Sequence, residues 1–232
     1  MQKPAFVENE VYHIYNRGVE KRSIFEDDAD RFRFIHDLFE FNDQRPAANM
    51  YYHFNQQLPK TEPRNKKSPR KLIVDILAFC LMPNHYHLLL KQKTKNGIVN
   101  FMKKMGTGYA MYFNQKYQRV GPLFQGRFKA VLVNRDSHLL YLPHYIHLNP
   151  LDLFMPEWRD KKLRNHKSAL KFLENYRWSS FPDYVGIKNF PSVTNREFIL
   201  KLLGEKTDDY KKDIVAYLKN LNLDSIDNYL LE

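Results

Sequence analysis

Two hydrophobic periods alternate along the first 150 positions, and each predicts one type of element. The β-branched and aromatic run at 11–15 ends in Asn16-Arg17-Gly18, which predicts a strand followed by a turn. From Asp27 to about Asn42 apolar residues recur every three or four positions, which predicts a helix with aspartates at its start.

A second set of elements follows a polar segment. The β-rich runs 72–81 and 85–91 lie on either side of Met82-Pro83-Asn84 and predict a hairpin. Helical spacing over 96–117 and a β-rich run at 128–133 predict a helix and a further strand. A last helix is expected from Asp136 to Asn149-Pro150, with Pro143 kinking or splitting it.

This order of elements predicts an α+β fold. We expect a ferredoxin-like antiparallel sheet with helices on one face over residues 1–155, and a helical C-terminal extension over 156–232. Residues 43–71 form a predicted insertion, because the periodicity fails there. Its prolines and clustered lysines and arginines suit either a flexible phosphate-binding arm or a solvated linker.

The charge balance suggests a polyanionic partner. Among 232 residues, 37 Lys and Arg face 26 Asp and Glu, a net charge of +11, and residues 204–232 are acidic, so the basic excess belongs to the preceding part. The 17 Phe and 15 Tyr are interleaved with basic residues, so stacking on unpaired bases becomes a candidate function. Nucleic acid is therefore the expected partner.

Several other classes are not indicated. The 43% hydrophobic content argues against wholesale disorder, and no apolar run is long enough to span a bilayer. A lone cysteine, Cys80, cannot form an intramolecular disulfide, and the first residues lack a signal-peptide pattern, so we expect a cytoplasmic protein that does not bind membranes. No glycine-rich phosphate loop is present, which argues against P-loop and Rossmann chemistry.

Two short motifs carry candidate chemistry. His85 and His87 are two positions apart in a predicted strand, so they project from one face about 7 Å apart and suit a shared metal ion. Tyr145 and Asn149 are four apart in a predicted helix and lie on one of its faces. A metal held by two histidines and an amide would leave positions for phosphodiester oxygens, and a nearby cation would help a tyrosine attack phosphorus. Each motif alone also suits ordinary packing.

Together, four segments resemble the single-tyrosine transposases of the HUH superfamily, in particular the REP-associated tyrosine transposase branch. The resemblance covers roughly residues 8–186 and is carried by 81–89 (LMPNHYHLL), 121–128 (GPLFQGRF), 145–150 (YIHLNP) and 176–180 (YRWSS). Trp178 in the last segment is expected to seal the C-terminal region onto the domain.

The resemblance implies a ferredoxin-like domain that cuts and rejoins single-stranded DNA beside a hairpin through a 5′-phosphotyrosine. It implies Tyr145 as nucleophile, His85, His87 and Asn149 as metal ligands, and Mg²⁺ or Mn²⁺ as cofactor. Because this set of ligands lacks the carboxylate that Mg²⁺ usually favours, Mn²⁺ or Zn²⁺ is left open as the bound metal. Monomer and homodimer are both compatible with the resemblance.

A set of basic and aromatic residues near predicted strand ends and turns is expected to bind DNA. The candidate DNA-binding residues are Arg17, Lys21, Arg22, Arg119, Phe124, Arg127, Lys129 and Arg135, with Phe128 and Tyr109 as further stacking candidates.

Two rival readings come from other functional classes. The first is a non-catalytic nucleic-acid-binding protein that keeps the fold. The second is a zinc-dependent hydrolase that uses His85, His87 and one of His138, His144 or His147, although no glutamate stands beside the pair as a general base.

Overall fold

The computed structural model describes residues 4–45, 69–134, 136–160, 163, 165–204 and 207–219. Most of the predicted insertion 43–71 lies outside these ranges, as does Arg135. The choice between a phosphate-binding arm and a linker therefore stays a prediction.

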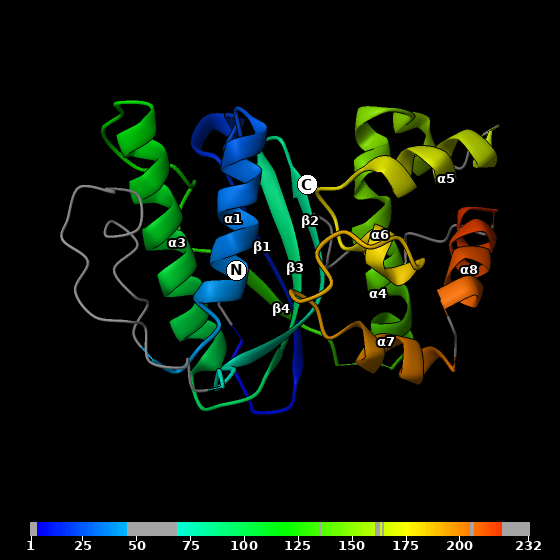
Figure 1. Ribbon diagram of the computed structural model, residues 1–232, viewed down its shortest axis with the longest axis horizontal. Helices are drawn as coiled ribbons and strands as arrows, with labels where there is room; N and C mark the ends of the chain where they lie inside the picture. Colours follow the sequence, from blue (N-terminus) through cyan, green and yellow to red (C-terminus); the bar gives the residue numbers. More distant parts are fainter. Residues whose placement is uncertain are drawn as a thin grey trace.

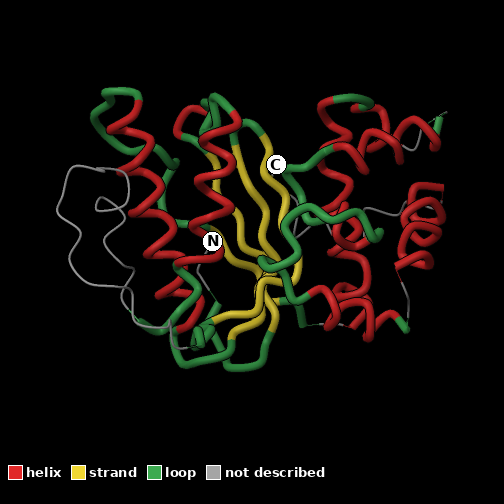
Figure 2. The backbone as a smooth tube through the Cα atoms, viewed as in Figure 1, coloured by secondary structure: helices red, strands yellow, loops and turns green. Residues whose placement is uncertain are grey.

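Four antiparallel strands form one sheet at the centre of the molecule (Figure 2). They are β1 (Val11–Arg17), β2 (Val74–Met82), β3 (His85–Gln92) and β4 (Lys129–Leu132), and their order in the sheet is β2-β3-β1-β4. Helix α1 (Asp28–Glu40) connects β1 to β2, and α3 (Gly97–Lys116) connects β3 to β4. This β-α-β-β-α-β order confirms the ferredoxin-like prediction.

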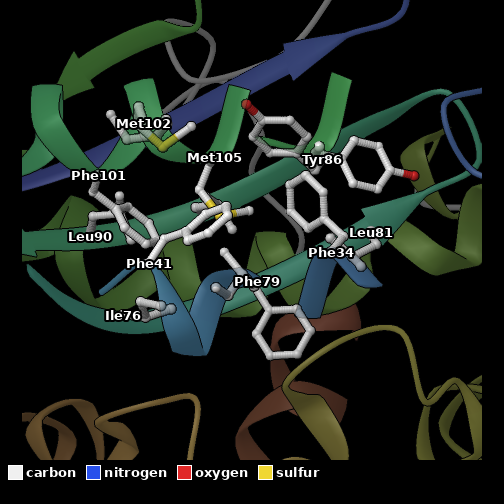
Figure 3. Close-up of a cluster of buried hydrophobic side chains, with 14 of the residues drawn as sticks. Phe34, Phe41, Ile76, Phe79, Leu81, Tyr86, Leu90, Phe101, Met102 and Met105 are labelled. Carbon is white, nitrogen blue, oxygen red and sulfur yellow. The ribbon is translucent and has the colours of Figure 1, made fainter. Parts of the chain in front are cut away.

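Helices α1 and α3 cover one face of the sheet (Figure 1). Asp27 caps α1 as the sequence predicts, since its side chain accepts from the Asp30 backbone and Asp30 reciprocates. Between the helices and the sheet lies a core rich in aromatic and methionine side chains, including Phe34, Phe79 and Met105 (Figure 3). The apolar faces that the helical and strand periods predict in the sequence form the two sides of this core.

The C-terminal half covers the opposite face of the sheet (Figure 1). It contains α4 (Asp136–Leu148), η2 (Asn149–Leu153), η3 (Pro156–Asp160), α5 (His166–Asn175), α6 (Phe181–Tyr184), α7 (Arg196–Leu203) and α8 (Thr207–Lys219). Helices thus cover both faces, two from the ferredoxin-like unit and the rest mainly from the predicted extension. One hydrophobic cluster joins Tyr145 of α4 to Ile214 of α8. None of the helices in the described ranges is long and apolar enough to cross a bilayer.

Helix α4 passes through Pro143 as one continuous helix, so a split at this proline is wrong, and the alternative, a kink, stays a prediction. Leu142, Tyr145 and Ile146 are buried in the cluster that α4 forms with the sheet. This packing holds the helix together where the proline removes one backbone hydrogen bond.

The segment Trp178–Ser180 closes the outer edge of the sheet. The Leu81 amide donates to the Trp178 carbonyl at 2.8 Å, and the Ser180 amide donates to the Phe79 carbonyl at 3.0 Å. Trp178 is buried against the α1 side of the sheet. These contacts confirm that Trp178 seals the C-terminal region onto the sheet, and they protect an edge that would otherwise expose unpaired backbone groups.

Candidate active site

Two histidines of β3 lie on the face of the sheet that α4 covers. The ring centroids of His85 and His87 are 5.1 Å apart, with the ring planes nearly perpendicular. The strand therefore brings this pair together as the sequence predicts. Two short contacts orient the rings.

His13 of β1 holds the ring of His87. The His13 Nε2 and His87 Nδ1 atoms are 2.9 Å apart in a buried hydrogen bond, and the two rings are stacked. Because this contact occupies Nδ1, the second ring nitrogen of His87, Nε2, is the one left to act on a ligand. That Nε2 atom is buried and has no hydrogen-bond partner among the residues that the structure describes. A buried nitrogen without a partner is what a metal-binding imidazole presents before it binds its ion.

His85 is fixed in a similar way by its neighbour. Its Nδ1 atom lies 2.6 Å from Oδ1 of Asn84. Burial lowers the pKa of His85 to about 4 and also lowers the pKa of His87 well below its usual value. Both imidazoles are therefore neutral near pH 7, which is the state that coordinates a cation.

Tyr145 reaches the histidine pair from α4. Its side chain is 1% exposed, and its ring centroid lies 5.9 Å from that of His87 in an edge-on arrangement. Burial raises the pKa of Tyr145, while the charge and hydrogen bond of Arg159 and a hydrogen bond from Asn149 act in the opposite direction. The phenol thus lies beside the neutral imidazole of His87 and one permanent cation, Arg159.

Asn149 lies one helical turn beyond Tyr145 and is 1% exposed. Its Nδ2 atom donates to the Tyr145 carbonyl at 2.8 Å, and its Oδ1 atom lies 3.5 Å from Nη2 of Arg159. The amide is therefore part of the cluster around Tyr145, as its spacing predicts. Its role as a metal ligand stays a prediction.

The described residues contain no group of three or more His, Cys, Asp or Glu side chains arranged to hold a metal ion. The donors that fit one are the two β3 imidazoles, with an oxygen ligand such as the Asn149 amide or a phosphate completing the set.

Sequence reasoning missed three members of this cluster. His13 comes from β1, 74 positions from His87, and no local spacing connects the two. Arg159 and Asp152 lie in the two 3-10 turns after α4, η3 and η2. The only sequence signal for Arg159 is that it begins the basic stretch after Pro150.

Two of the other candidate histidines, His144 and His147, are engaged elsewhere, while the role of His138 stays a prediction. His147 is fully buried, and its two ring nitrogens lie 2.7 Å from the hydroxyls of Tyr210 and Ser180. His144 is stacked between Tyr210 and Tyr217. Both rings pack α4 against α8, and His147 also binds Ser180, so neither serves as the third ligand of a zinc hydrolase.

The predicted DNA-binding residues differ in their surroundings. Arg17 is paired across the sheet with His85, and its Nε donates to Gln125 at 2.6 Å, so the loop 121–127 lies beside the candidate site. Exposed side chains at Arg127 and Lys129 continue from this loop onto β4, whereas Arg119 hydrogen-bonds Asn114 at the end of α3. Lys21 and Arg22 follow β1 in the short turn η1 (Val19–Lys21) and at its end.

Two predicted stacking residues lie in the core. Phe124 is 9% exposed and its ring packs near Tyr86, while Tyr109 is fully buried and donates to the Ile24 carbonyl at 2.5 Å. Neither ring offers a face to a base, because both belong to the core beneath α3.

Comparison with known proteins finds similarity over part of the chain. Residues 64–149 match the sequence model of the family described as "Transposase IS200 like". The chain is 33% identical to Transcription factor E of Methanosarcina mazei over 85 residues. The aligned part is 36% of this chain and 52% of that protein. The chain thus spans about half the length of that curated relative.

Two solved structures show weaker likeness. The first is described as "Structure of the REP associates tyrosine transposase bound to a REP hairpin", with 12% identity and a TM-score of 0.47 over 82% of this chain and 88% of that one. The second is a tRNA(His) guanylyltransferase from Saccharomyces cerevisiae, with 11% identity and a TM-score of 0.35 over 97% of this chain and 83% of that one.

Proposed function

We propose that this chain, whose residues 64–149 belong to the IS200-like transposase family, is a metal-dependent DNA strand transferase that acts through Tyr145. The observation that carries the proposal is the position of Tyr145, whose ring lies 5.9 Å from that of His87. The unpartnered Nε2 of His87 belongs to the same buried cluster. A phenol beside an imidazole that can hold a metal ion suits attack on a phosphate, because the ion would offset the charge that develops there.

In the proposed reaction, the Tyr145 oxygen attacks a phosphorus atom of single-stranded DNA. A bond forms between that oxygen and phosphorus, and the bond between phosphorus and the 3′ oxygen breaks with its electron pair on the 3′ oxygen. The phenol proton passes to water, and the departing 3′ oxygen takes a proton from water. The products are a 5′-phosphotyrosine and a free 3′ hydroxyl, and attack by a 3′ hydroxyl reverses the step and joins two strands.

The chain's own residues prepare this reaction in two ways. Asn149 and Arg159 direct hydrogen-bond donors toward the Tyr145 hydroxyl, which favours its charged form. His85 and His87, with Asn149 as the proposed third ligand, would hold a Mg²⁺ or Mn²⁺ ion. When bound, such an ion polarises the phosphate and offsets the charge that develops on its oxygens.

The basic residues beside the site are proposed to position the DNA strand. Arg17 is paired with His85 of β3, and the exposed Arg127 and Lys129 continue from the loop 121–127 onto β4. Phosphate contacts of this kind fix the register of a strand without reading its sequence. We propose a hairpin-containing single strand as the substrate, bound by a monomer or a homodimer.

A covalent adduct assay tests this proposal. Hairpin DNAs with single-stranded flanks are labelled at the 3′ end and incubated with protein and Mn²⁺ or Mg²⁺. The 3′ label is expected to migrate with the protein on a denaturing gel, whereas a 5′ label is expected to leave as a shorter strand. Tyr145→Phe and chelation are each expected to abolish the adduct. An adduct that survives in Tyr145→Phe would refute the assignment of the nucleophile.

The burial of Tyr145 favours one alternative function. A phenol that is 1% exposed needs a local opening before it can reach a phosphate. If the protein never opens, it is a non-catalytic nucleic-acid-binding protein with the same basic surface. That alternative predicts tight DNA binding without an adduct, and unchanged binding in His85→Ala and Tyr145→Phe.

A further inference from the structure

We infer that Arg159 is a further catalytic residue, whose guanidinium binds the nucleophilic oxygen of Tyr145 and a non-bridging oxygen of the phosphate that it attacks. Asp152 is the positioning residue that aims this guanidinium. The inference rests on the proposed function and adds a group that lies outside the segment matched by the transposase family.

The position of Arg159 is the first argument. Its guanidinium carbon lies 5.8 Å from the centre of the Tyr145 ring, and its Nη2 atom lies 3.5 Å from Oδ1 of Asn149. The positive charge of Arg159 is also one of the causes that lower the pKa values of His85 and His87. Arg159 therefore faces the nucleophile and the candidate metal ligands together, although it comes from a different turn of the chain.

The hold of Asp152 on Arg159 is the second argument. Nε of Arg159 donates to Oδ1 of Asp152 at 2.9 Å, and Nη2 donates to Oδ2 at 2.7 Å. The indole nitrogen of Trp158 donates to the same carboxylate at 2.7 Å. This two-point contact fixes the plane of the guanidinium and leaves its remaining N–H groups for other acceptors.

A purely structural role explains this arrangement less well. The Arg159 and Asp152 side chains are 25% and 27% exposed, so their ion pair is in contact with solvent. The pair thus meets solvent on one side and the ring of Tyr145 on the other. Its partial exposure also leaves the guanidinium within reach of an incoming phosphate.

The chemistry suits a phosphate ligand. When the Tyr145 oxygen bonds to phosphorus, negative charge grows on the non-bridging oxygens while the 3′ oxygen departs. Asp152 holds Nε and Nη2, which leaves the N–H groups of Nη1 to donate to such an oxygen, and the guanidinium stays charged throughout. Because Asp152 and Trp158 already orient it, little reorganisation is needed when the charge develops.

The test measures cleavage and binding separately on the full chain. With saturating 3′-labelled hairpin DNA and Mn²⁺, the first-order rate constant of adduct formation is measured for the wild type and for Arg159→Gln, Arg159→Lys and Asp152→Asn. The Kd of the same DNA is measured without metal. Arg177→Gln removes an equal charge from an exposed arginine beside Phe32 and serves as the matched control.

We expect Arg159→Gln to lower the rate constant by about 100-fold or more, the usual effect of removing one donor to a developing oxyanion, with Kd changed less than about 3-fold. Arg159→Lys is expected to recover part of this loss, because it restores the charge without the fork. Asp152→Asn is expected to fall between Arg159→Gln and the wild type, since it keeps the guanidinium and weakens its hold.

Three outcomes would overturn the inference. The first is a wild-type rate in Arg159→Gln, and the second is an equal loss in Arg177→Gln. The third is a loss of DNA binding as large as the loss of rate, which would make Arg159 an ordinary phosphate contact. A circular dichroism melt checks that each variant folds, and if Arg159→Gln unfolds, Arg159→Lys and Asp152→Asn decide the question. An adduct that needs Tyr145 but not Arg159 rejects only this inference, whereas no wild-type adduct rejects the proposed function as well.

Discussion

Replacement of His144 by phenylalanine should change how the stability of the protein depends on pH. His144 is buried in α4 next to the proposed nucleophile, with its ring stacked on Tyr210 at 4.9 Å and on Tyr217 at 5.5 Å between centroids. Burial lowers its pKa to about 4, although the charge of Asp213 acts in the opposite direction. A phenylalanine keeps the aromatic contacts and cannot be protonated.

The magnitude follows from the difference between the folded and unfolded pKa values. Between an ordinary pKa of 6.5 and the folded pKa of about 4, the unfolded chain binds a proton at this position and the folded chain does not. Stability from this histidine is therefore present above pH 6.5 and is lost as pH falls toward 4. At about 1.4 kcal/mol per unit, the full loss amounts to roughly 3 kcal/mol.

Urea unfolding at several pH values between 7.5 and 4.5 measures this effect. Asp37 complicates the absolute slope, because burial raises its pKa to about 6 and its contribution is lost as pH rises instead. The quantity to compare is therefore the difference in unfolding free energy between His144→Phe and the wild type. We expect His144→Phe to gain up to about 3 kcal/mol relative to the wild type as pH falls. A difference that stays constant from pH 7.5 to 4.5 would refute the reasoning.

Three further predictions concern residues that connect distant elements. His13→Phe should weaken Mn²⁺ binding by about 10-fold or more in calorimetry, because groups that orient a metal-binding imidazole typically contribute that much. Ser180→Ala should lower the urea-unfolding free energy by about 1–3 kcal/mol, since the Phe79 amide and His147 both lose a buried partner. Asn42→Ala should cost a similar amount or more, because its side chain makes three hydrogen bonds to the backbone of residues 73 and 74.

Matched substitutions separate these effects from general damage. His166→Phe on α5, away from the sheet histidines, should leave Mn²⁺ affinity unchanged, and an equal loss there would contradict the role given to His13. Ser192→Ala, at an exposed serine, should leave stability unchanged within about 0.5 kcal/mol. A wild-type urea-unfolding free energy in Ser180→Ala or Asn42→Ala would contradict these predictions and show that other hydrogen bonds replace the lost ones.

Local patterns in the sequence determined the ferredoxin-like unit. The periods of two and of three to four residues identify strands and helices because each reports which side of a short segment is apolar. The spacing of His85 and His87 and of Tyr145 and Asn149 places each pair on one side of one element for the same reason. These relations involve residues within one turn or one strand, so no distant partner is needed to predict them.

Tertiary structure alone decided which of these groups meet and what surrounds them. His13 reaches His87 because β1 pairs with β3, and Arg159 reaches Tyr145 because η2 and η3 fold back beside α4. The sequence shows that positions 109 and 124 are aromatic but not whether these rings lie in the core or on the surface. Only the packing beneath α3 decided that Tyr109 and Phe124 are buried. Periodicity shows that a face is apolar but not which distant segment covers it. The chemistry-bearing pairs were therefore visible in the sequence, while the groups that orient them came from packing between segments far apart along the chain.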